Sequence, residues 1–227
     1  TLFYAALLPG LLAVLTTFYL KENRIKEQQQ RVATPFFSFL HYWKEGPSDY
    51  KRLVIGLLVF TLFNSSDVFL LLKAKESGLE DTMVIGIYIF YNLIYALFAF
   101  PVGIIADKVG LKTIFIIGLI LFSGVYVGMS FNTNLYVFFG LFFLYGIYAA
   151  ATEGISKAWI SNIVNKKDTA TAIGTYTGFQ SIGTMLASSL TGLIWFQFGA
   201  AVAFNTTAIA TLGVMIYFLT IPKPKST

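Results

Sequence analysis

Long runs of apolar residues dominate the chain, and polar residues are concentrated in the segments between them. A helix of about 20 mainly apolar residues crosses the roughly 30 Å hydrocarbon core of a bilayer, whereas a barrel strand needs only about ten alternating positions. The runs therefore predict transmembrane helices, in which each backbone amide is bonded inside its own segment. Seven spans are predicted, over residues 1–20, 53–72, 83–105, 113–131, 135–157, 169–195 and 201–221.

One long polar stretch divides these spans into one plus six. We expect a transmembrane helix over 1–20, a linker over 21–52, a six-helix bundle over 53–221 and a tail over 222–227. Aromatic and basic residues lie together in the second half of the linker, a pattern typical of a short interfacial helix. The chain begins inside an apolar run, without Met or the basic stretch of a secretory signal, so we expect a piece of a longer protein.

Composition excludes most other classes of protein. Hydrophobic residues make up 56% of the chain and charged residues only 12%, which excludes a soluble domain and a disordered chain. Cysteine is absent and His41 is the single histidine, so we expect no metal site, no cofactor and no catalytic residue. The chain has no HExxH, GxSxG or GxxxxGK[ST] motif, which argues against an enzyme and against nucleotide-driven transport.

The positions of the basic residues predict the orientation. Thirteen of the sixteen Lys and Arg fall in the linker, in the turns 106–112 and 165–168, and in the tail, which share one face if the helices alternate. The opposite loops hold only Lys73 and Lys75. Because basic residues are retained in the cytoplasm, the linker and the C-terminus are predicted to be cytoplasmic. The net charge of +5 then indicates contact with anionic membrane lipid and not with nucleic acid.

The turn after the 83–105 span carries a recognisable motif. Its members are Gly103, Asp107, Lys108, Gly110 and Lys112. This turn resembles the loop motif of the major facilitator superfamily, which has a Gly, an Asp four residues later, a basic residue, a second Gly and then usually two basic residues. Leu111 departs from that pattern. Gly110 is suited to end the turn at positive φ, and the alternative role is a tight charged turn that only anchors the loop.

The resemblance covers essentially the whole chain. It implies an all-α, polytopic membrane protein with one plus six helices: residues 1–20 would be the sixth helix of the superfamily fold, and 53–221 would be helices seven to twelve. It also implies a secondary active transporter of a small solute that works by alternating access, in the plasma membrane. The partner of this half would be the amino-terminal half of the same protein. The alternative is a receptor or scaffold on the same fold that does not transport.

Ionisable residues at membrane depth are costly, and they often mark function. Asp67 ends the polar sequence that begins at Asn64, and their spacing of three places both on one face of a helix. The alternative for Asp67 is an interfacial acid that reaches toward Lys73 and Lys75. Glu153 and Lys157 lie four residues apart, which suits an intrahelical ion pair; they either line the pathway of substrate or proton or only stabilise that helix.

The resemblance implies two inverted triplets of helices with sites on the first helix of each, which is where Asp67 and Glu153 fall. These two acids predict proton coupling. Two polar stripes are further candidates for the lining or, alternatively, for helix packing. One stripe contains Tyr88, Tyr91, Asn92 and Tyr95, and the other contains Thr177, Gln180, Ser181, Thr184, Ser188 and Thr191.

Overall fold

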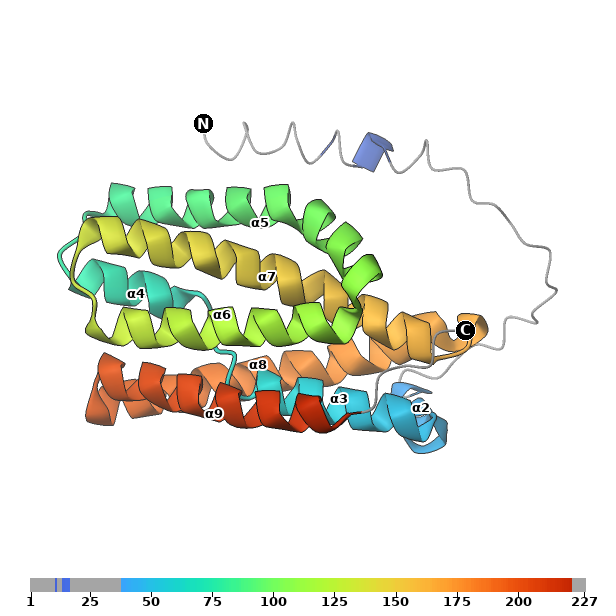
Figure 1. The fold of residues 1–227 in the computed structure, drawn as a ribbon. Helices are drawn as coiled ribbons and strands as arrows, with labels where there is room; N and C mark the ends of the chain where they lie inside the picture. Colours follow the sequence, from blue (N-terminus) through green and yellow to red (C-terminus); the bar gives the residue numbers. More distant parts are fainter. Residues whose placement is uncertain (1–10, 12–13, 17–37, 222–227) are drawn as a thin grey trace. The chain divides into compact units, whose positions relative to one another are not determined.

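The computed structural model describes residues 11, 14–16 and 38–221 (Figure 1). Most of the predicted span 1–20, the linker as far as residue 37 and the tail 222–227 lie outside the described residues. The described part from residue 38 onward is helical. Its elements are α2 (Ser38–Glu45), α3 (Ser48–Thr61), α4 (Val68–Glu76), α5 (Asp81–Val109), α6 (Leu111–Phe131), α7 (Leu135–Ile163), a short 3-10 turn at Lys166–Asp168, α8 (Thr169–Phe198) and α9 (Ala200–Thr220).

Four of these helices, α5, α6, α7 and α9, are long and apolar enough to cross a membrane by themselves. The predicted spans 83–105, 113–131, 135–157 and 201–221 fall on these helices, and α5 and α7 continue beyond them. The predicted span 169–195 lies within α8, whose 30 residues include many hydroxyl side chains. The all-helical membrane bundle predicted from the sequence is therefore confirmed.

The span predicted over residues 53–72 is not a single helix. α3 ends at Thr61, α4 begins at Val68, and the backbone between them is not helical. The sequence of this break includes Asn64-Ser65-Ser66-Asp67, whose short polar side chains compete for backbone hydrogen bonds. The backbone N–H of Ser66 donates to Ser188 Oγ of α8 at 3.2 Å, so a neighbouring helix satisfies a group that the break leaves unpaired.

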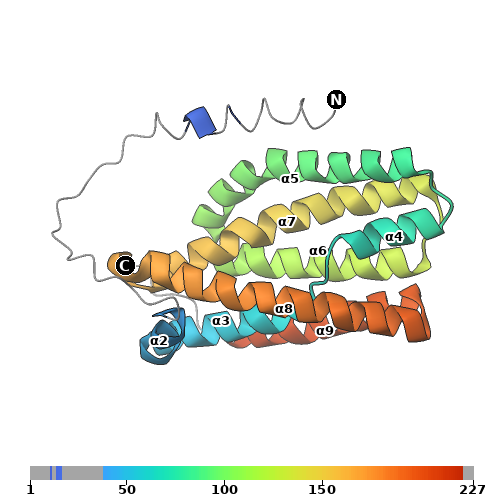
Figure 2. The ribbon, with the colours of Figure 1, turned by 180° about the vertical axis from the view of Figure 1, so that it is seen from behind.

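The long helices run beside one another as a bundle (Figures 1 and 2). α7 packs against both α5 and α6, and α6 also packs against α9, while α3 contacts α7, α8 and α9. Phe115, Phe122, Tyr126, Tyr145 and Trp159 are fully or almost fully buried among these helices. Large aromatic side chains thus form much of the core that holds α6 and α7 together.

Because the helices alternate in direction, the basic segments meet at one end of the bundle. The start of α3, the turn from α5 to α6, the turn from α7 to α8 and the end of α9 all lie at this end, called the basic end below (Figure 1). Lys73 and Lys75 lie at the opposite end, in the last turn of α4. The arrangement agrees with the predicted sharing of one face.

Two further local features follow from the sequence. A helix, α2, is present in the aromatic part of the linker, and its Trp43 ring contacts Phe179 of α8 at 5.7 Å between ring centres. α5 bends in its last third, where Pro101 lies inside the helix (Figure 1). Proline removes one backbone hydrogen bond and clashes with the preceding turn, which explains a bend at this position.

Candidate functional site

The break between α3 and α4 positions the first acidic side chain. Asp67 is the residue immediately before α4, and its carbonyl accepts from the backbone N–H groups of Leu70 and Leu71 at 3.0 and 3.2 Å. Asp67 thus begins a new helix in the interior of the bundle. The amino-terminal end of a helix carries partial positive charge, which favours a carboxylate there.

Two tyrosine hydroxyls hold the Asp67 carboxylate. Tyr145 of α7 donates to Asp67 Oδ1 at 2.6 Å, and Tyr91 of α5 donates to Oδ2 at 3.0 Å. Both tyrosines are buried, and their rings are 5.2 Å apart between centres. Hydrogen bonds to a charged acceptor are short and strong, so each carboxylate oxygen has a well-placed donor.

The alternative interaction of Asp67 with the lysines of α4 is not present. Lys75 pairs with Asp81 at 2.7 Å, and both of these side chains are exposed. The donors to Asp67 are neutral hydroxyls, and no ion pair joins its carboxylate to a cation among the described residues. Asp67 is therefore a half-buried acid that is oriented without being neutralised.

Glu153 is placed differently. It lies in the continuous helix α7, its side chain is exposed, and Tyr95 of α5 donates to its Oε2 at 3.0 Å. The predicted ion pair between Glu153 and Lys157 is wrong, because no salt bridge joins them in the described part of the chain. The spacing of four allowed the pair, but the Glu153 carboxylate instead bonds across the interface to α5.

A small recess collects three of the predicted site residues. Asn64 of the break, Glu153 of α7 and Gln180 of α8 all line it. Its volume is about 30 Å³, enough for one water molecule. Further polar side chains surround this space, namely Thr61, Tyr148, Thr152, Ser156 and Tyr176. The sequence-predicted polar residues of the break, α7 and α8 therefore line one small space.

Tyr88 and Asn92 lie beside this arrangement without bonding to either acid. Tyr88 is exposed, and its ring lies 5.9 Å from that of Tyr91 between centres. Asn92 is half-buried, and its Nδ2 donates to the Tyr88 carbonyl of its own helix at 2.8 Å. Lys157 is exposed on α7, one turn from Glu153. Among the described residues, none of these three forms a hydrogen bond or an ion pair with either acid.

Sequence reasoning missed Tyr145, which makes the shortest hydrogen bond to Asp67. Tyr145 lies eight residues before Glu153, about two helical turns, so that spacing was the available signal. Two more polar groups were also missed. Ser65 Oγ and Tyr126 OH are buried, and neither has a hydrogen-bond partner within the described structure.

The motif in the turn from α5 to α6 has a defined geometry. Gly110 has φ of 97°, in the region that favours glycine, and it separates the two helices as expected. Lys112 Nζ donates to the carbonyls of Leu219 and Ile221, at 3.0 and 2.5 Å, at the end of α9. A lysine at the carboxy-terminal end of a helix pairs with its unsatisfied carbonyls.

Two other residues of the motif line a groove. Gly103 and Asp107 line a groove of about 280 Å³ between α5 and α7, together with Tyr95. Asp107 and Lys108 are exposed in the last turn of α5. Tyr95, the donor to Glu153, thus also borders the groove that is lined by Gly103 and Asp107 of the motif.

Comparison with known proteins gives concordant results. The family model described as Major Facilitator Superfamily matches residues 53–227. An uncharacterized MFS-type transporter of Methanocaldococcus jannaschii is 29% identical over 192 residues, which are 82% of this chain and 47% of that protein. The chain thus spans about half the length of this curated relative.

A solved structure shares the fold. The crystal structure of the POT family transporter PepTSo aligns with a TM-score of 0.62 at 14% sequence identity. The alignment covers 79% of this chain and 40% of that chain. At this identity the likeness concerns the arrangement of helices.

Proposed function

The chain belongs to the major facilitator superfamily, and we propose that it forms part of a proton-coupled secondary transporter that moves a small solute by alternating access. The observation that carries this proposal is the placement of Asp67 and Glu153, each bonded to tyrosine hydroxyls of other helices and to no cation among the described residues.

An acid that can gain and lose a proton suits this arrangement better than an acid that is permanently charged. A carboxylate at membrane depth is costly unless a cation or water compensates it. Protonation removes that charge, and a carboxylic acid can still accept from the same tyrosine hydroxyls. Asp67 and Glu153 can therefore change charge while they keep their positions, as a proton carrier must.

The two acids also occupy equivalent places in the fold. Transporters of this type have repeated helix triplets, with sites at the interface between repeats. Here α3 with α4 opens one triplet and α7 opens the other. We place the solute next to the recess lined by Asn64, Glu153 and Gln180, where alternating exposure to the two sides would couple solute to proton movement.

Uptake into proteoliposomes tests this proposal. The protein in its complete form would be assayed with a panel of radiolabelled sugars, amino acids and cationic drugs, with and without an inward pH gradient. Asp67→Asn and Glu153→Gln are expected to abolish the stimulation by the gradient. Asp81→Asn is the matched control, since that acid pairs with Lys75 at the surface. Uptake that does not change with the pH gradient, or stimulation by the gradient that persists in both variants, would contradict proton coupling.

The proposed topology places the basic end of the bundle in the cytoplasm. The 227 residues contain no cysteine, so a cysteine introduced among them, in a complete protein without other cysteines, makes the orientation directly testable. In intact cells an impermeant maleimide should label Ser77→Cys and spare Lys108→Cys. The reverse pattern would show the opposite orientation.

A further inference from the structure

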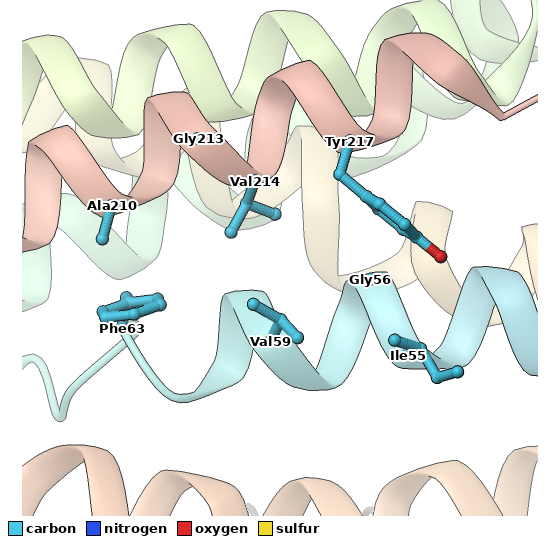
Figure 3. A pocket seen from close by; sticks show the side chains of 8 residues that line it. All are labelled: Ile55, Gly56, Val59, Phe63, Ala210, Gly213, Val214 and Tyr217. Carbon is cyan, nitrogen blue, oxygen red and sulfur yellow. The ribbon is translucent and has the colours of Figure 1, made fainter.

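A third cavity lies on another side of the bundle, between α3 and α9. It is a groove of about 270 Å³. Figure 3 shows the side chains along it: Ile55 and Val59 from α3, Phe63 from the break that follows α3, and Ala210, Val214 and Tyr217 from α9. Apart from the Tyr217 hydroxyl, these side chains present only carbon atoms. The groove therefore has little means of recognising a polar solute, which needs converging polar groups.

Two glycines shape this groove. Gly56 makes a close approach at one end, since an added Cβ would lie 2.7 Å from the Tyr217 ring and 2.8 Å from the Phe218 ring. Gly213 lies farther along α9, and an added Cβ there would meet no atom within 4 Å. The helices thus touch near Gly56 and leave open space near Gly213 (Figure 3).

A cation lies at the closed end. Arg52 precedes Ile55 and Gly56 by one helical turn, so it lies on the same side of α3, and its side chain is exposed. Tyr217 OH donates to the Arg52 backbone carbonyl at 2.9 Å, which joins the two helices directly below that side chain. Arg52 therefore lies beside the closed end of the groove, on the side of the basic end of the bundle.

Neighbouring basic side chains at this end are engaged within the protein. Lys51 Nζ donates to the Lys44 carbonyl at 2.7 Å, and Lys112 Nζ donates to the carbonyls at the end of α9. By contrast, no side-chain hydrogen bond or ion pair joins the Arg52 guanidinium to another described residue. The guanidinium can offer a forked pair of donors to a phosphate.

We propose that this groove binds one acyl chain of an anionic phospholipid, with the lipid phosphate on Arg52. The helical rise from Ile55 to Thr61, the last residue of α3, is about 9 Å, and Phe63 extends the groove beyond it, which accommodates part of an acyl chain. A helix of about 10 Å diameter would not fit a space of this volume. Apolar walls and a cation at the headgroup level match the two parts of such a lipid.

The test measures lipid retention by the complete protein. The protein would be reconstituted in nanodiscs of equal phosphatidylglycerol and phosphatidylcholine, extracted in mild detergent, and analysed by native mass spectrometry. We expect retained phosphatidylglycerol to exceed phosphatidylcholine. Arg52→Gln should reduce that preference about fivefold, the factor that corresponds to the loss of one basic contact near the membrane surface. Lys108→Gln, at the same end of the bundle but outside the groove, should keep the preference.

A second variant tests the acyl chain separately. Gly213→Phe fills the open space and should lower retention of both lipids, whereas Gly124→Phe, at an exposed glycine of α6 that also has no atom within 4 Å, should not. Equal retention of the two lipids by the wild type would overturn the proposal. Unchanged lipid retention in Gly213→Phe would also overturn it. If that variant kept its lipid but lost solute uptake, the groove would be assigned to the solute.

Discussion

The two segments that carry the membrane acids are the break before α4 and the middle of α7, and they hold a carboxylate within the membrane bundle in different ways. At Asp67 the helix is interrupted, and the half-buried carboxylate accepts from two buried tyrosines. At Glu153 the helix is continuous, and an exposed carboxylate accepts from one half-buried tyrosine. The difference teaches that Asp67 is placed by a break in the backbone and held by two buried hydroxyls, whereas Glu153 is placed by a regular helix and held by one half-buried hydroxyl.

The largest contrast should appear in amide exchange. Amides of the break, residues 63–67, should exchange on the order of 100-fold faster than those of residues 148–156, because the break has few intrahelical hydrogen bonds whereas α7 is continuous. Hydrogen-deuterium exchange with mass spectrometry on overlapping peptides measures this. Equal protection of the two segments would mean that a continuous helix forms through residue 67.

The next largest difference between the two acids should appear when the tyrosine hydroxyl bonded to each is removed. Tyr145→Phe removes a 2.6 Å bond to a half-buried carboxylate, worth about 1.5 to 3 kcal/mol, so gradient-driven uptake should fall roughly tenfold or more. Tyr95→Phe removes a bond to an exposed carboxylate and should cost less than about threefold. Similar losses in the two variants would argue that both acids are held equally.

Helix packing near the tyrosines can be tested with two glycines of α7. Gly146→Ala would place a Cβ 2.9 Å from Ile94 Cβ and 3.0 Å from the Tyr91 carbonyl, so α5 must shift, at a cost of about 1 to 3 kcal/mol. The control is Gly140→Ala, where no atom lies within 4 Å and alanine favours the helix. Thermal melting should therefore show a lower Tm for the first variant and an equal or higher Tm for the second.

The smallest expected effect concerns the contact between the break and α8. Ser188→Ala leaves the Ser66 N–H without its acceptor and should destabilise the protein by about 1 kcal/mol, seen as a slightly lower Tm. Ser189→Ala is the matched control, because the Ser189 hydroxyl donates only within its own helix, to the Met185 carbonyl. If the two variants melt alike, Ser188 does not stabilise the break.

The two acids could be predicted from the sequence because charged residues are rare within the apolar runs. Asp67 and Glu153 stand out in apolar runs, and Gly110 stands out by its place in a recognised loop motif. The interruption of the 53–72 span was not foreseen, because two half helices of apolar residues give the same run of hydropathy as one whole helix. Only the hydroxyl of Ser188, 122 residues away, shows how the break is satisfied.

Tyrosine partners were harder to predict for a related reason. The chain has 13 tyrosines and 23 phenylalanines, so the two-turn spacing from Glu153 alone does not separate Tyr145 from core aromatics; its bond to Asp67 of the break does. The expected Glu153 to Lys157 pair failed because local spacing says only which groups can meet. The hydroxyl of Tyr95, 58 residues distant in sequence, bonds to the same carboxylate.

Lys112 gives the loop between α5 and α6 a mechanical connection. Its ammonium group bonds to the last carbonyls of α9, so the first turn of α6 is tied to the end of α9. We expect a displacement of that loop to displace the end of α9 as well, through the bonds made by Lys112. A spin label or fluorophore at Ile221 would therefore report motion of a motif more than one hundred residues earlier.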